Sequence, residues 1–168
     1  MAFKLLKGIP DDANEFLVAT IGNTKTIAVG DALVPLGTGH TKFVGGAASS
    51  STTIIGVCVA ILNAQNGPTG LDSVTTGGSN ETTVVYKAQY LPLTFPGLWT
   101  ATLSAAAGTT TDSDGIGSFN LNATNNTLDE TSIALVTATE KQFFSFGLDP
   151  SDTTKKTVIG VWCKALTP

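Results

Sequence analysis

The chain has 168 residues, enough for one domain with a buried core or for a compact domain with a small appendage. Charged residues make up 13% of it, about half the usual share, the formal net charge is −4, and all nine basic residues are lysine. We therefore expect no binding to nucleic acid, which requires dense cationic contacts with phosphates, and no run is apolar enough to predict a membrane span.

Threonine and glycine together account for 45 of the 168 residues, which favours β-structure because threonine suits pleated strands and glycine suits turns. Short apolar or alternating segments separated by turn residues predict an all-β fold, either a β-sandwich or a small barrel. In chain order the predicted strands are residues 16–21, 26–36, 52–62, 82–95, 98–105, 118–123, 132–138, 141–148 and 157–166.

The expected domain organisation is an extended N-terminal arm, residues 1–15, followed by a single β-domain, residues 16–168. A division of that domain into two β sub-modules, residues 16–81 and 82–168, is an alternative. Residues 63–81 form one long loop rich in glycine and threonine, and loops of this length are usually functional or disordered.

The most apolar segment, "TTIIGVCVAIL" at residues 52–62, is echoed near the C-terminus by "TKKTVIGVWCKAL". Consecutive apolar residues predict central strands, and Gly56 and Gly160 predict places where another backbone or a large ring packs closely. Cys58 and Cys163 would point to opposite faces in equal registers, so we expect both to be free, buried thiols rather than a disulfide.

The residues give no indication of catalysis. The single histidine, His40, lies in an expected loop without an accompanying nucleophile motif, so we predict neither an enzyme nor a cofactor. Asp112 and Asp114 resemble the start of a calcium loop, but Ile116 and Ala123 break the EF-hand pattern. These two aspartates are therefore candidates only for a calcium site of another kind, and a plain turn is the alternative.

"TIAVGDALVPL", followed by a glycine-rich stretch and "TTIIGVCVAIL", resembles the opening of the capsid decoration (cement or auxiliary) proteins of tailed bacteriophages. The C-terminal segments "DGIGSFNLNATNNTLDETS" and "KQFFSFGLDPSDTTKKTVIGVWCKAL" are similar to the end of small virion proteins from phages. This resemblance implies a protein on the outer face of the capsid, made in the host cytoplasm, that stabilises the shell by binding major capsid protein subunits.

If the resemblance holds, the N-terminal arm and the long loop are expected to contact the major capsid protein and neighbouring copies of the chain. The alternative function is a phage tail, fibre or adhesin-like β-module that contacts a receptor or a carbohydrate. The apolar residues of the two segments are the candidate contact residues: Phe3, Leu5, Leu6, Ile9 and Pro10 in the arm, and Pro68 and Leu71 in the loop.

Overall fold

The protein is all-β, as the composition and the strand pattern predict. Within the described residues, each element is a strand except for a short 3₁₀ helix, Glu130–Ser132. The computed structural model describes residues 3–7, 16–37, 43–47, 53–93, 97–107, 114–122, 127–132 and 142–163.

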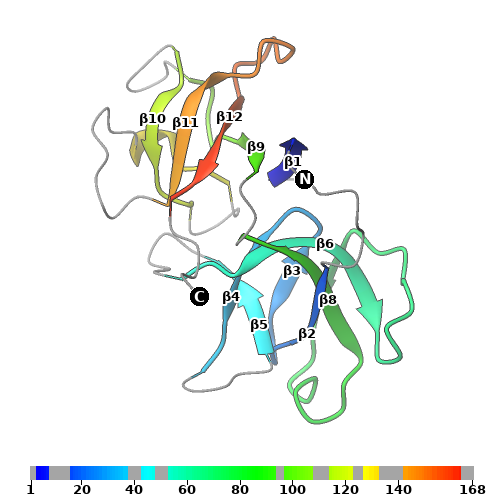
Figure 1. Cartoon of the computed structure of the whole chain (residues 1–168). Helices are drawn as coiled ribbons and strands as arrows, with labels where there is room; N and C mark the ends of the chain where they lie inside the picture. The colour runs from blue at the N-terminus through cyan, green and yellow to red at the C-terminus, as the bar shows by residue number, and fades with distance from the viewer. Residues whose placement is uncertain are drawn as a thin grey trace.

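Five strands from the first half of the chain close into a barrel, which forms the lower part of Figure 1. In chain order these are β2 (Leu17–Ile21), β4 (Ala32–Pro35), β5 (Phe43–Gly46), β6 (Gly56–Asn63) and β8 (Tyr86–Pro92). Around the barrel they run β2-β5-β4-β6-β8, and β8 pairs back to β2. Alternating apolar residues fill the interior, as in other small barrels. They include Ile21, Leu33, Val44, Cys58, Ile61 and Ala88.

The long loop predicted at residues 63–81 is tied to the barrel and contains a strand of its own. Within it, β7 (Ser73–Thr75) pairs antiparallel with β3 (Thr26–Ala28). The buried hydroxyl of Thr76 donates to the carbonyl oxygen of Gly22 at 2.5 Å, which joins the end of β7 to the barrel.

Asn80 fixes the end of this loop. Its buried amide nitrogen donates to the carbonyl oxygens of Ile21 and Tyr86 at 2.6 and 3.0 Å. Its amide oxygen accepts the N–H groups of Val85 and Tyr86 at 2.9 and 3.0 Å. Because both ends of the side chain are paired with backbone, the loop has a defined path where it returns to β8.

The second half of the chain forms a five-stranded sheet that also takes in the N-terminus, in the upper part of Figure 1. Its strands are β1 (Phe3–Lys7), β9 (Leu98–Thr102), β10 (Ile116–Phe119), β11 (Phe143–Leu148) and β12 (Thr157–Trp162). They are antiparallel and run β1-β9-β12-β11-β10 across the sheet.

A short connection closes this sheet over its own apolar face. Leu128 forms bridges with Leu103, just past β9, and with Leu121, just past β10. The backbone N–H of Leu128 donates to the carbonyl oxygen of Thr102 at 2.9 Å. The two distant strands β9 and β10 are therefore linked at one end, and the sheet curls around its core.

The repeated phrase forms the two central strands β6 and β12, as predicted. A Cβ atom on Gly56 would lie 2.5 Å from the carbonyl oxygen of Leu91 and would meet the Tyr90 ring. A Cβ atom on Gly160 would lie 2.5 Å from the Phe143 ring and would meet the carbonyl oxygen of Phe144. The prediction that each glycine admits a backbone and a ring is confirmed. The prediction that both faces of these strands are covered is not met in β12, whose outward-facing side chains are half-exposed.

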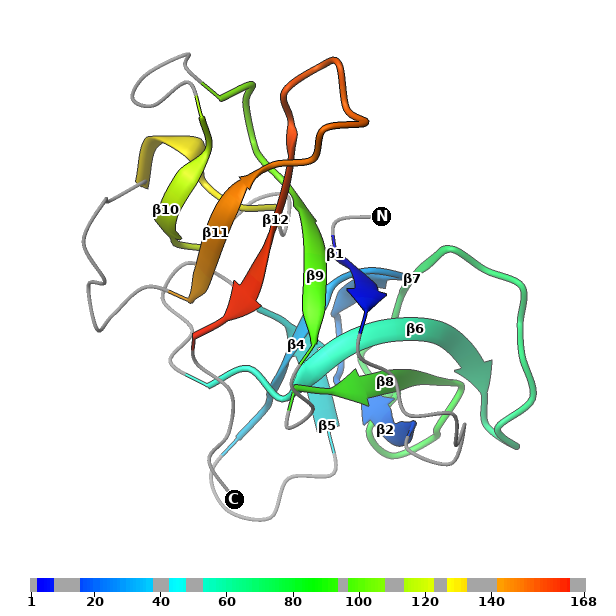
Figure 2. The ribbon, with the colours of Figure 1, turned by 45° about the horizontal axis from the view of Figure 1, so that its top comes forward.

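Residues 3–7 belong to the five-stranded sheet, which differs from the expectation of a separate N-terminal arm. Phe3 lies opposite Ala101 and Leu5 opposite Trp99 in the pairing of β1 with β9. The N–H of Phe3 donates at 3.0 Å to the carbonyl oxygen of Gly30, in the turn between β3 and β4 of the other half. β1 therefore joins the sheet to the barrel, as Figure 2 shows.

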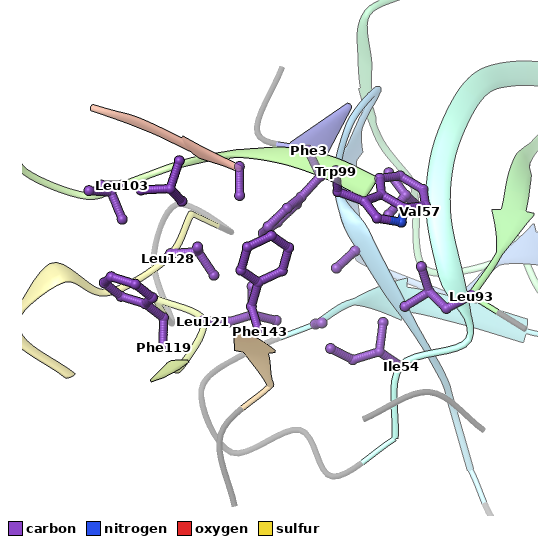
Figure 3. Packing of buried hydrophobic residues seen from close by; sticks show 14 of the residues in the cluster. Phe3, Ile54, Val57, Leu93, Trp99, Leu103, Phe119, Leu121, Leu128 and Phe143 are labelled. Atoms are coloured by element: carbon purple, nitrogen blue, oxygen red, sulfur yellow. The ribbon is translucent and has the colours of Figure 1, made fainter. Parts of the chain in front are cut away.

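The boundary between the two halves also differs from the alternative division after residue 81. β8 closes the barrel, so the chain passes into the five-stranded sheet between residues 93 and 97. One apolar core extends across the boundary: Figure 3 shows it running from Phe119 through Phe143 to Trp99 and Val57. The two halves consequently share their largest buried cluster.

Candidate interaction surface

Apolar side chains cover the outer face of the five-stranded sheet. Ile116 on β10 lies directly opposite Phe146 on β11, and these side chains are 44% and 55% exposed. Phe144 lies opposite Val161 on β12, and both are half-buried. Because side chains alternate across a strand, Ile159 points to the same face as Val161. We call this set the outer apolar face: Ile116, Phe144, Phe146, Ile159 and Val161.

Phe146 lies on this face by the same alternation as Phe144, and its pairing with β10 is regular. A β-bulge occurs here in the pairing with β12, which shifts between Ser145 and Gly147. Gly147 has φ of 140°, a conformation that favours glycine, and its N–H donates to the Ser145 hydroxyl oxygen at 3.1 Å. Here the rings of Phe144 and Phe146 meet edge to face, with centroids 5.4 Å apart.

The turn that joins β11 to β12 is rigidly hydrogen-bonded and keeps these strands in register. The carboxylate of Asp149 accepts the Ser151 hydroxyl at 2.7 Å, and the carboxylate of Asp152 accepts the Thr154 hydroxyl at 2.6 Å. These hydrogen bonds to the charged forms lower the pKa of both aspartates. The turn therefore holds its geometry at neutral pH.

Charge on this sheet lies at its β1 edge, where the exposed Lys4 is opposite Thr100. The sequences of β9, β10, β11 and β12 contain no charged residue, and hydroxyl groups such as those of Thr102 and Thr157 stand beside the apolar side chains. Away from the β1 edge, an apolar protein surface could displace water from the Phe144 and Phe146 rings together. The outer apolar face is therefore suited to contact with another apolar surface.

The contact residues expected from the sequence have different positions in the structure. Phe3 is 1% exposed and belongs to the core, so its interpretation as a surface contact is wrong while β1 is paired. Leu5 packs partly against the same core, and Leu6 is exposed beside it. Pro68 and Leu71 are exposed on the loop of the barrel. Ile9 and Pro10 lie outside the described residues.

The outer apolar face is not among the contact residues predicted from the sequence. The segment "FFSFGL" predicts a strand, but three phenylalanines in four residues are as compatible with a strand buried on both faces. Gly147, directly after Phe146, is the signal for a bulge. Without the pairing partners, however, the sequence does not show which face of this strand the core leaves uncovered.

The cysteines are free, as expected, but only one of them is buried. Cys58 lies in the barrel interior, where burial, with a smaller contribution from the Asp31 carboxylate, raises the pKa of its thiol to about 12. The thiol is therefore protonated and unreactive at neutral pH. Cys163 is exposed, which corrects the expectation that both would be buried.

Of the two candidate calcium ligands, only Asp114 lies within the described residues. Asp114 is exposed in the turn before β10, while Asp112 and also His40 lie outside the described residues. Within the described part of the chain, no three His, Cys, Asp or Glu side chains gather as a metal site would require. In the same part, no helix is both long and apolar enough to span a bilayer.

No family model matches the chain, and no curated protein or solved structure is significantly similar to it. The function is therefore inferred from the geometry of the outer apolar face and from the sequence.

Proposed function

We propose that the chain is a structural protein of a virion that decorates the assembled capsid and stabilises it by binding major capsid protein subunits. The outer apolar face is the observation that carries this proposal. It combines the exposed Phe146 ring beside the half-buried Phe144 ring, neighbouring hydroxyl groups, and strands β10 to β12 that contain no charged residue. In this role the chain makes and breaks no covalent bond and needs no cofactor. The sequence resemblance to decoration proteins supports the same proposal.

Modest affinity per copy is sufficient for such a role. Burying an exposed phenylalanine or isoleucine contributes about 1.5–3 kcal/mol when burial is complete, and Phe146 and Ile116 each have about half of their surface free to bury. Many copies that bind a symmetric shell together then act through avidity. The proposal therefore does not need a deep pocket or a charged anchor.

Binding to empty shells of the major capsid protein tests the proposal. The wild-type chain is expected to sediment with the shells, and Phe146→Ser should weaken binding about ten-fold or more because it removes the most exposed ring of the face. Val85→Ser is the matched control, since Val85 is 50% exposed but lies just before β8 of the barrel. Equal binding of the two variants would remove the outer apolar face from the interface.

The copy number in purified virions tests the location on the capsid exterior. A decoration protein is present in hundreds of copies per particle, on the order of the number of shell subunits that it binds. Six copies or fewer would instead indicate a component of the tail or portal. Absence of the chain from the particles would exclude both virion roles.

One observation favours the alternative, a tail, fibre or adhesin-like module. The Phe144–Phe146 pair is exposed on one side, and aromatic rings also stack against sugars. Its position in mid-strand rather than on a loop tip is less typical of a receptor contact. A glycan array separates the two functions: binding that Phe146→Ser abolishes, without any binding to shells, would support the adhesin.

A further inference from the structure

We propose that β1 is exchanged between copies, so that residues 3–7 of one chain occupy the edge of β9 in a second copy. This inference deepens the proposed function and rests on it, because exchange is effective where copies stand side by side. The structure defines what β1 binds in either copy: the edge of β9, the aromatic site around Phe3, and the Gly30 carbonyl oxygen.

β1 comes from a different part of the chain than the other strands of its sheet. The other four strands, β9 to β12, come from one continuous part of the chain, whereas β1 comes from the opposite end, before the barrel. It pairs with a single neighbour, β9, and its register with that neighbour is irregular between Leu5 and Lys7. A terminal strand at a sheet edge can leave and return without unthreading any other segment.

Phe3 is the buried side chain of β1, and Leu5 packs partly against the same core. The Phe3 ring lies 4.7 Å from the Trp162 ring and 6.2 Å from the Phe143 ring, measured between centroids. Lys4 and Leu6 are exposed. The same aromatic site fits Phe3 of any copy equally well, because a second copy of the chain carries the identical strand.

An apolar groove that is partly open to solvent runs between β1 and the barrel. It has a volume of about 210 Å³ and is lined by Phe3 and Leu5 on one side and by Val57, Val59 and Leu91 on the other. Phe3 and Val57 belong to the same buried cluster, so β1 covers apolar residues of the barrel. The strand of a second copy presents the same side chains and can cover this surface equally well.

Unexplained exposed apolar residues flank the connector on both sides. Leu6 precedes it and is 50% exposed, while Leu17 and Val18 follow it at the start of β2 and are also exposed. The connector, residues 8–15, can span at most about 26–29 Å. When two copies exchange β1 they stand side by side, and contact between them can bury exposed apolar residues such as these.

Cysteine pairs across β1 and β9 test the exchange in solution, without capsids. Lys4 and Thr100 are directly opposite, with about 5 Å between Cα atoms, which suits a disulfide. Chains with Lys4→Cys and chains with Thr100→Cys, both in a Cys163→Ser background, are co-expressed with tags of different size. Under oxidising conditions we expect the non-reduced band to shift from the mass of one chain to that of a mixed dimer.

A chain that carries both Lys4→Cys and Thr100→Cys is the control for geometry, since it can form the disulfide within or between chains. If this double variant forms the bond only within one chain and the mixture gives no mixed dimer, exchange is excluded. Leu17→Ser should lower the mixed-dimer fraction, whereas Val85→Ser should not. The cross-linking result is independent of shell binding. If no mixed dimer forms but the chain still sediments with shells, only the exchange is overturned. If the mixed dimer forms but the chain does not sediment with shells, only the capsid role is overturned.

Discussion

At the residue scale, Gly160 occupies a point in β12 where a side chain would collide with β11. We expect Gly160→Ala to lower the free energy of unfolding by about 2–3 kcal/mol, because its Cβ would press on a neighbouring backbone carbonyl that cannot move freely. Gly78→Ala is the control, since nothing lies within 4 Å of that Cβ position, and it should change stability by less than about 1 kcal/mol. Urea denaturation measures both. Similar values for the two variants would contradict the close packing.

A second residue-scale prediction concerns Cys58 and pH. Its folded-state pKa is raised from 9.0 to about 12, so the folded state keeps the proton that the unfolded state loses above pH 9. The unfolded state then binds fewer protons, and stability falls as pH rises from about 9 to 12. The free energy of unfolding should fall more steeply for the wild type than for Cys58→Ala, with a difference approaching about 1.4 kcal/mol per pH unit. Parallel pH profiles would contradict the burial of a protonated thiol.

The roles of single residues follow from the sequence where the cause is local. Gly56 and Gly160 interrupt apolar runs, and the close contacts that this predicts are present. Cys163 shows where local reasoning ends: β12 finishes at Trp162, so Cys163 is the first residue past the strand and is exposed. The apolar residues Val161 and Trp162 before it do not reveal the strand end, because that end depends on the pairing with β11.

At the element scale, Phe3 is the buried side chain through which β1 enters the core. Phe3→Ala should cost about 3–5 kcal/mol, because a buried aromatic side chain is removed from between Trp162 and Phe143. Leu6→Ala on the same strand should cost less than about 0.5 kcal/mol, since Leu6 is exposed. Thermal and urea denaturation of the two variants check the contrast. A small effect of Phe3→Ala would mean that β1 contributes little to the folded state.

Elements with a clear apolar pattern were predictable, and those without one were not. Most strands of the barrel and of the sheet follow from apolar or alternating runs, but β5 lies in a stretch whose pattern predicts no strand. β1 is recognised only through its pairing with β9, where Lys4 and Thr100 are 96 residues apart, because "FKLLK" is too short to define a strand. The exposure of Phe146 is similar, since it depends on which face of the paired strands the core covers.

At the scale of the whole molecule, the barrel and the sheet are two curved units that share one core. Ile54, Val57 and Leu93 from the barrel side pack in the same cluster as Phe143 and Trp99 from the sheet side. A boundary read from the sequence alone falls at the flexible-looking loop before β8, because glycine and threonine are concentrated there. The closure of the barrel by β8 moves the real boundary to the proline-containing segment after it.

The shared core predicts that the two halves unfold together. The chain offers separate probes, because both tryptophans, Trp99 and Trp162, lie in the sheet, and both tyrosines, Tyr86 and Tyr90, lie in the barrel. Tryptophan emission and the ¹⁹F signals of fluorotyrosine should therefore give coincident urea transitions.

Leu33→Ala makes this test decisive. Leu33 is fully buried inside the barrel and belongs to a cluster separate from the shared core, so its loss should cost about 2–5 kcal/mol within the barrel alone. If the shared core couples the halves, the tryptophan transition moves to lower urea by the same amount as the tyrosine transition. If only the tyrosine signals move, the barrel unfolds by itself. The sheet would then be an independent unit that holds the outer apolar face without help from the barrel.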